Sequence, residues 1–284
     1  MPDIIAHRGF QGIYPENTVA AVRNATSGEN HPVPDMVEID VQPCEGGEVV
    51  VFHDEELMKH GDRGLTDKEG ETWRTGCDEV LSAEVLRSGE TVPRLEEVLE
   101  AVPDDVGVNI EFKDVDSEEV QFTWGDGTHP GLGRSLNAEE RERRTEIWSD
   151  FVKGVLETAS GFENDLLVSS FFEGAIAATR RISDVPTAFL FWESIEEGFE
   201  VVERHDCEAV HPPIDMIKGV FFGGEIYTEG SFDDIDLVER AHAEGRRVNV
   251  WTVDTWFQAD RMLESGVDGL IADYPLLTLF SSRE

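Results

Sequence analysis

Residues 36–43, MVEIDVQP, decide the fold, because apolar and polar side chains alternate along them. The order is Val37, Glu38, Ile39, Asp40, Val41 and Gln42. Successive side chains of a β-strand point to opposite faces, so one face of this strand is apolar and the other carries two carboxylates. Residues 106–114, VGVNIEFKD, repeat the pattern and place Glu111 and Lys113 on the polar face. We expect two strands, each with an apolar face against helices.

Further apolar runs, mostly followed by helical patterns, extend this alternation along the chain. The expected strands are 4–6, 36–41, 106–112, 166–170, 186–191, 209–211, 248–253 and 269–272. The expected helices are 18–25, 95–102, 138–159, 174–182, 195–204, 235–243 and 257–264. Strands alternating with helices over about 250 residues are typical of a closed parallel TIM (β/α)8 barrel. A doubly wound open sheet is the alternative.

Three stretches do not fit the bare repeat: 54–92, 114–136 and 213–231. Each follows a strand, so in a barrel each lies at the C-terminal face, where active-site loops gather. Surface insertion without a functional role is the alternative for each stretch. No linker divides the chain, so we expect one domain of 284 residues.

The composition limits the compartment and the cysteine chemistry. No window approaches the roughly 20 consecutive apolar residues of a membrane span, and no signal-peptide pattern is present. We therefore expect a cytoplasmic protein without stable membrane insertion. Cys44, Cys77 and Cys207 are odd in number and far apart, without CxxC spacing. We expect all three to be reduced structural residues.

The net charge of −38, from 61 acidic and 23 basic residues, limits the partners. Self-repulsion of this size destabilises a compact chain unless salt screens it, and the screening length falls to about 3 Å at 1 M salt. The composition resembles that of proteins from organisms with molar cytoplasmic salt. Nucleic acid and anionic membranes are not expected as partners, because no basic patch exists to hold them. The sequence makes no prediction of the oligomeric state.

The carboxylates of the two alternating strands predict a metal site. In a barrel, Glu38, Asp40 and Glu111 point inward at the C-terminal mouth, where they repel one another unless a cation neutralises them. Ligation by oxygen alone suits Mg²⁺ or Ca²⁺ rather than zinc. The alternative for either strand alone is an edge strand with its polar face in water.

Two histidines and two cations lie near the same predicted mouth. His7 ends the first strand and His53 ends the run VVVFH, and an imidazole accepts and returns a proton near neutral pH. Arg8 and Lys113 supply a local site for phosphate. The alternative for a single histidine is a structural role. His211 is a weaker pocket candidate, and the histidines at 31, 60, 129, 205 and 242 receive no role.

Nine motifs, in order from residue 6 to residue 275, resemble the glycerophosphodiester phosphodiesterase family. They are AHRG (6–9), PENT (15–18), EIDVQ (38–42), FHD (52–54), PRLEEVL (93–99), IEFK (110–113), VSSF (168–171), NVWTVD (249–254) and DGLIADYP (268–275). Each motif alone is weak, whereas the ordered set is specific.

The resemblance implies a TIM barrel with a small insertion after the second strand, which residues 54–92 would supply. It implies metal-dependent hydrolysis of a glycerophosphodiester to glycerol phosphate and an alcohol. Position by position, it makes His7 and His53 the acid/base pair, Glu38, Asp40 and Glu111 the metal ligands, Arg8 and Lys113 phosphate contacts, and Trp251 an aromatic lining the glycerol side.

The sequence departs from the family at three places, of which Ala272, where the family often has threonine, is a minor change. The stretch after FHD lacks the threonine-rich run that the family more often carries, which puts substrate contacts from the insertion in doubt. Residues 114–136 are longer than a minimal family loop, and Trp124 and His129 are candidates to reach over the pocket.

Two other functions stay open. A phospholipase of the phosphatidylinositol or sphingomyelin type would share the barrel and the paired histidines. A catalytically silent phosphate-ligand binding protein would share the fold alone, because fold does not imply function. Trp251 has a core role as its alternative, and the head group, the choice of Mg²⁺ or Ca²⁺, and the separate parts of the two histidines stay open.

Overall fold

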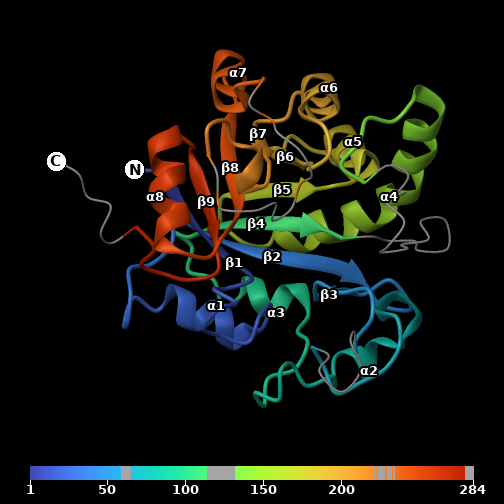
Figure 1. Cartoon of the computed structure of the whole chain (residues 1–284). Helices are drawn as coiled ribbons and strands as arrows, with labels where there is room; N and C mark the ends of the chain where they lie inside the picture. Colours follow the sequence, from blue (N-terminus) through green and yellow to red (C-terminus); the bar gives the residue numbers. More distant parts are fainter. Residues whose placement is uncertain are drawn as a thin grey trace.

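A closed ring of parallel strands forms the centre of the molecule. The computed structural model describes residues 1–58, 65–113, 132–220, 222, 228, 232 and 234–278, so Trp124, His60 and His129 lie outside the described residues. The ring strands are β1 (Asp3–His7), β2 (Met36–Pro43), β4 (Gly107–Phe112), β5 (Leu166–Ser170), β6 (Thr187–Leu190), β7 (Ala209–His211), β8 (Arg247–Val253) and β9 (Gly269–Ala272). Each pairs in parallel with the next, and β1 pairs with both β2 and β9 (Figure 1). The predicted TIM barrel is confirmed, and the open-sheet alternative is wrong because hydrogen bonds between β1 and β2 close the ring.

Helices surround the ring, and they follow the expected pattern closely. They are α1 (Val19–Thr26), α3 (Leu95–Leu99), α4 (Ala138–Ala159), α5 (Glu173–Ile182), α6 (Ile195–His205), α7 (Leu237–Ala243) and α8 (Trp256–Ser265). Short 3-10 turns η2 (Thr72–Arg74) and η3 (Ile214–Met216) and the short helix α2 (Cys77–Val80) complete the described elements. No described helix is long and apolar enough to cross a membrane.

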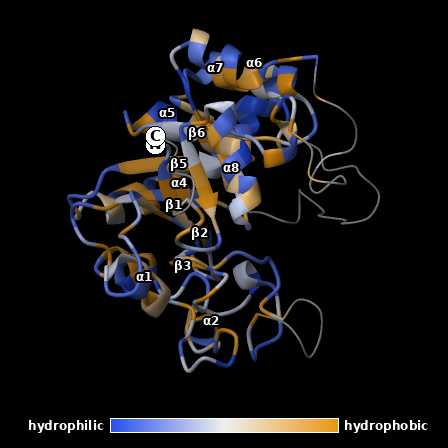
Figure 2. Ribbon diagram, turned by 60° about the vertical axis from the view of Figure 1, so that its left-hand side comes forward, coloured by the Kyte–Doolittle hydropathy of each residue, from blue (hydrophilic) through white to orange (hydrophobic). Residues whose placement is uncertain are grey.

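The apolar faces of the strands pack against the helices, as the alternation predicts. Val37, Ile39 and Val41 of β2 are fully buried and share one cluster with Val22 of α1 and Trp148 of α4. A second cluster joins β6 to β9 with α6, α7 and α8. The surrounding helices carry both hydrophobic and hydrophilic residues (Figure 2), which fits helices with one face on a barrel. The polar side chains of the strands are therefore left facing the inside of the ring.

The described residues between β2 and α3 gather on one side of the barrel, with α2 away from the ring (Figures 1 and 2). β3 (Val49–Val51) pairs antiparallel with β2 and lies outside the ring. A separate buried cluster fills this region. Its members are Cys44, Val50, Phe52, Leu57, Val80, Ala83, Val85 and Val92.

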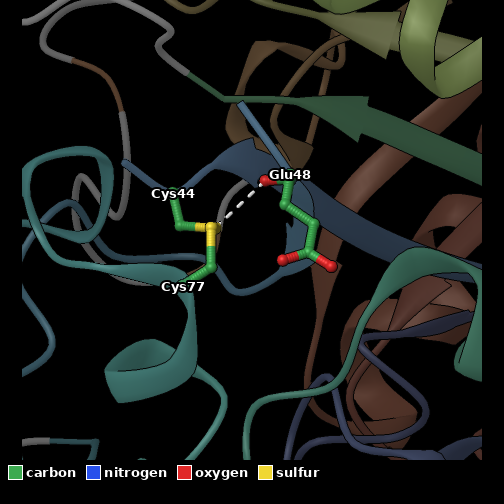
Figure 3. Close-up of side chains that lie close together, drawn as sticks. All are labelled: Cys44, Glu48 and Cys77. Carbon is green, nitrogen blue, oxygen red and sulfur yellow. Dashed lines mark hydrogen bonds between the residues drawn. A yellow bond between two sulfur atoms is a disulfide. The ribbon is translucent and has the colours of Figure 1, made fainter. Parts of the chain in front are cut away.

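The prediction of reduced cysteines is wrong for two of the three. Cys44 and Cys77 form a disulfide, because the fold brings residues 33 positions apart to a Cα–Cα distance of 5.3 Å (Figure 3). Closing a loop of this length stabilises a fold by about 3–4 kcal/mol in the chain-entropy view. Cys207 is free and buried as expected, and burial raises the pKa of its thiol to about 11.

Candidate active site

Three carboxylates meet inside the barrel at the carboxyl ends of β2 and β4. The parallel register places Asp40 beside Glu111 and Glu38 beside Asn109. Glu38, Asp40 and Glu111 are buried, with exposed fractions of 1%, 0% and 6%. Each offers an oxygen within 4.8 Å of the others. The structure therefore brings the three predicted metal ligands together.

Two cations lie among these carboxylates. Arg8 places Nε 3.1 Å from Asp40 Oδ2 and Nη1 2.8 Å from Glu16 Oε1. Lys113 places Nζ 2.9 Å from Asp40 Oδ1 and also pairs with Glu111. Both cationic side chains are mostly buried, so their charges are weakly screened. Asp40 is the carboxylate that both cations share.

The three carboxylates differ in how far the neighbouring cations offset the effect of burial on their pKa values. Burial raises the pKa of Asp40, but Lys113 and Arg8 more than offset it and hold that pKa well below its ordinary value. Burial, then repulsion from Asp40 and Glu111, raises the pKa of Glu38 well above its ordinary value. Burial likewise raises the pKa of Glu111, which Lys113 offsets only in part. The cluster carries more negative charge than its two cations balance.

This donor set fits a divalent cation. Oε1 of Glu38 is buried and has no hydrogen-bond partner within the described part of the chain. An unpaired buried carboxylate oxygen costs free energy that a hard cation would recover. The ligands are all oxygen, which favours Mg²⁺ or Ca²⁺. The second group of metal-ligating residue types, Cys44, Glu48 and Cys77 (Figure 3), offers no thiolate, because its sulfurs are joined.

Both predicted histidines reach this mouth. His7 Nδ1 lies 2.6 Å from Asp273 Oδ1, and its Nε2 lies 3.9 Å from Glu38 Oε2. His53 lies in the loop after β3, with Nδ1 2.7 Å from Asp54 Oδ1. Burial, then the charges of Arg8 and Lys113, lowers the pKa of His53 to about 3. Each imidazole is thus held through Nδ1 by a carboxylate, which leaves Nε2 for other contacts.

The loop after β1 supplies residues that the sequence interpretation did not assign to the site. Asn17 Nδ2 donates to Asp40 Oδ2 at 2.8 Å, and Asn17 Oδ1 accepts from the Asp40 backbone N–H at 3.2 Å. Asn17 has φ of 56°, a left-handed conformation that Asn tolerates better than most residues. Thr18 caps α1 by accepting from the Ala21 N–H. The PENT motif therefore does two things. Asn17 positions Asp40, a candidate metal ligand, and Thr18 begins helix α1.

The aromatic Trp251 is half-buried rather than part of the core. Its Nε1 donates to the carbonyl oxygen of His211 at 2.7 Å, and its ring meets the edge of Phe171 at a centroid distance of 5.6 Å. Phe171 also contacts Trp192 at 5.1 Å. Phe171 and Trp192 follow β5 and β6, so an aromatic wall runs along this part of the rim.

The other described histidines have structural partners. His211 is fully buried, bonds to Asn249 at 3.0 Å, and has its pKa lowered to about 3 mainly by burial. His31 packs on Phe10, and His242 pairs with Asp268. His205 pairs with Glu173.

A closed barrel that gathers buried acids, two cations and two carboxylate-bound imidazoles at one mouth is typical of an enzyme active site. The model of the glycerophosphoryl diester phosphodiesterase family matches residues 7–277. The chain belongs to this family, and it is a phosphodiesterase.

Relatives match over nearly the whole chain. A glycerophosphodiester phosphodiesterase of Bacillus altitudinis is 30% identical over 97% of this chain and 96% of its own length. One from Caldanaerobacter subterraneus subsp. tengcongensis is 28% identical over 96% of this chain and 94% of its own.

Solved structures share the fold. An Oleispira antarctica phosphodiesterase in complex with the product sn-glycerol-3-phosphate has a TM-score of 0.71 at 23% identity, covering 97% of this chain and 94% of its own. A glycerophosphodiester phosphodiesterase from Thermotoga maritima has a TM-score of 0.64 at 24% identity, covering 99% and 97%.

Proposed function

We propose that the enzyme hydrolyses glycerophosphodiesters to glycerol phosphate and an alcohol, with a divalent metal and His7 and His53 as its acid and base. The observation that carries this proposal is the convergence of two imidazoles and two cations on one buried carboxylate cluster. The Oleispira structure, named for its complex with sn-glycerol-3-phosphate, supports the same product class.

Glu38, Asp40 and Glu111 would hold the metal, Mg²⁺ or Ca²⁺. When bound, the cation would offset negative charge that grows on the phosphoryl oxygens. Arg8 and Lys113 would contact the same phosphate, since both place cationic atoms at Asp40 in the centre of the cluster. Trp251 would pack against the apolar side of the glycerol.

The two histidines would move the protons. One imidazole takes the proton of the attacking hydroxyl, from water or from the glycerol itself. Attack by the glycerol hydroxyl would first give a cyclic phosphate, which water then opens to glycerol phosphate. The other imidazole gives a proton to the alcohol oxygen as its bond to phosphorus breaks. Without that proton the leaving alkoxide is a poor leaving group, and acid–base assistance of this kind contributes about 10²- to 10⁴-fold.

A substrate panel tests the activity. The purified enzyme is assayed in molar KCl on glycerophosphocholine, glycerophosphoethanolamine and glycerophosphoglycerol, beside intact phosphatidylinositol and sphingomyelin. We expect release of glycerol phosphate from the soluble diesters, its loss in EDTA, and recovery with Mg²⁺ or Ca²⁺. Cleavage of the intact lipids alone would favour a phospholipase, and no cleavage with tight phosphate binding would favour a binding protein.

Histidine variants test the chemistry. His7→Ala and His53→Ala should each lose about 10²- to 10⁴-fold in turnover with unchanged folding. His242→Ala, which removes a histidine–carboxylate pair outside the site, is the matched control. A p-nitrophenyl leaving group needs no proton, so it should restore turnover in the variant that lacks the acid only. Normal turnover by both single variants would contradict the pair.

The domain organisation, the cellular location and the partners are also part of this proposal. We infer one catalytic domain over residues 1–284, with 54–92 as a small insertion, and the separate cluster beside β3 supports this division. A cytoplasmic location and a high-salt habitat stay predictions of the composition. The Cys44–Cys77 disulfide is instead typical of oxidising compartments or of intracellular proteins from hyperthermophiles. We also predict a small-molecule partner only, without nucleic acid.

A further inference from the structure

β8 and β9 are neighbouring strands of the ring (Figure 1). At the mouth, each is followed by an aspartate to which the proposed reaction gives no role. Asp254 follows Val253, and Asp273 follows Ala272. Val253 pairs with Ala272, so the two aspartates that follow these residues lie side by side, and each influences the charge of the other. Two neighbouring carboxyl groups raise the question of how their charges are balanced.

Asp273 is held in place from both sides. Its Oδ1 lies 2.6 Å from His7 Nδ1 and accepts from Gln11 Nε2 at 2.8 Å. Its backbone N–H donates to Val253 at 3.2 Å, and its carbonyl oxygen accepts from the Gly12 N–H at 3.0 Å. A fixed carboxylate at Nδ1 keeps the proton of a neutral imidazole on that nitrogen. Nε2 of His7 is then the free nitrogen, on the side of Glu38.

Asp254 adjoins Asp273 on the β8 side, away from His7. Its backbone N–H donates to Gln258 Oε1 at 2.8 Å, which fixes the turn into α8. Its Oδ1 is buried and receives no hydrogen bond from the residues that the structure describes. The charged groups around it are Asp273, at the end of β9, and His7 of β1 beyond that carboxylate, whereas α8 presents the neutral Gln258. Within the described part of the chain, no cation therefore balances a charge on Asp254.

Neighbouring carboxylates that repel one another titrate as a pair and hold one proton over a wide pH range. Burial, then the charge of Asp273, raises the pKa of Asp254 to about 6. Burial also raises the pKa of Asp273, but the contacts with His7 and Gln11 more than offset it, so its pKa lies below the ordinary value. This difference favours the proton on Asp254 and the negative charge on Asp273.

We propose that Asp254 and Asp273 form a proton-sharing carboxyl pair that positions His7, with Asp254 donating to Asp273 and Asp273 accepting from His7 Nδ1. The proposal rests on the function proposed above for His7. Both aspartates are positioning residues, because they act on the reaction through the imidazole. The pair presents one negative charge to His7 rather than two.

The tautomer of His7 tests the pair directly. In the enzyme with its activating cation and ¹⁵N-labelled histidine, NMR should show the neutral His7 ring protonated at Nδ1. In Asp273→Asn the ring should lose this preference, and kcat should fall about 10³- to 10⁴-fold with KM within about threefold of wild type. An Nδ1-protonated His7 ring in Asp273→Asn would overturn the proposal.

Asp254→Asn tests the shared proton separately. Its amide still donates to Asp273 but cannot ionise, so kcat at pH 5.5 should stay within about threefold of wild type. We expect an ionisation near pH 6 in the kcat of wild type, and it should be absent from this variant. An unchanged pH profile would overturn the pair, and this variant also carries the test if Asp273→Asn fails to fold.

Asp268→Asn is the matched control. It removes another carboxylate–histidine contact, 2.8 Å from Asp268 Oδ2 to His242 Nε2, away from the mouth. Its kcat, its pH profile and its His7 signals should equal those of wild type.

If wild type shows the Nδ1-protonated ring but cleaves no glycerophosphodiester, the pair is supported and the proposed function fails. The two proposals are therefore separable.

Discussion

One buried acid, Glu173, and the buried cluster of Glu38, Asp40 and Glu111 differ in how their surroundings satisfy them. Glu173, at the start of α5, is fully buried and pairs with Arg204 and with His205 at 2.9 Å, and it also accepts from the Leu136 N–H. Burial raises the pKa of Glu173, but these three partners more than offset it and leave that pKa lowered. One acid with several donors is a structural arrangement.

The mouth cluster has the opposite balance. Its three carboxylates share two cations, the pKa values of Glu38 and Glu111 are raised, and one oxygen of Glu38 has no partner among the described residues. A fold keeps such an arrangement at a cost, which a bound cation would offset. The comparison teaches that burial alone does not mark a functional acid. The balance of donors around it separates a ligand site from a structural contact.

The largest expected effect is on activity. Glu38→Gln removes a charge from the cluster, so kcat/KM should fall on the order of 10³-fold, which is several kcal/mol of metal-assisted stabilisation. The same change relieves repulsion with Asp40 and Glu111, so the metal-free protein should unfold at a higher temperature. Hydrolysis rates with saturating cation and thermal unfolding in EDTA measure the two effects. An activity close to wild type would remove Glu38 from the metal site.

Metal addition gives the next largest effect. A cation at about 100 times its Kd should raise the free energy of unfolding by about 2.7 kcal/mol. Wild type and Glu173→Gln should gain equally, whereas Glu38→Gln should gain little. Chemical denaturation in molar KCl with and without the cation measures the gain. Equal gains in all three proteins would place the cation elsewhere.

The structural acid should show the reverse behaviour. Glu173→Gln should lower the free energy of unfolding by about 2 kcal/mol. The loss is not larger because the Arg204 side chain is 32% exposed and solvent screens its charge. Turnover should stay within about threefold of wild type. Glu203→Gln, which breaks a surface pair with Arg240, is the matched control and should change stability by less than about 0.5 kcal/mol. A larger loss of activity than of stability would contradict the structural role.

The smallest expected effect is on the pH dependence of stability, which should have opposite signs for Glu173 and Glu38. The lowered pKa of Glu173 gives stability that is present above its unfolded pKa, about 4.3, and is lost as pH falls through its folded pKa. The stability difference between wild type and Glu173→Gln should therefore shrink below about pH 4.5. The raised pKa of Glu38 acts oppositely, so its stabilisation is present at low pH and is lost as pH rises. Denaturation curves of the metal-free variants across pH measure both differences.

The elements predicted from the sequence agree with the structure because their signals are local. The alternation in 36–43 and 106–114 shows which side chains face the helices, and it identified Glu38, Asp40 and Glu111 before any contact was known. Asn17 was missed, although its PENT motif was noted, because its bonds to Asp40 join the loop after β1 to the separate strand β2. Asp273 was missed for the same reason, since its partner His7 lies 266 positions away.

Two features depended on tertiary structure alone. The Cys44–Cys77 disulfide needs the residue after β2 to meet the start of α2, and no spacing rule in the sequence predicts that meeting. The contrast between Glu173 and Glu38 also arises from neighbours supplied by distant segments.

Periodicity, composition and ordered motifs were thus sufficient for the barrel, the family and the principal polar residues, because strand and helix patterns are written in neighbouring positions. Charge balance, hydrogen-bond partners and proton sharing were decided only when the ring closed. These properties depend on distances between side chains, and distances across the mouth exist only in the folded chain.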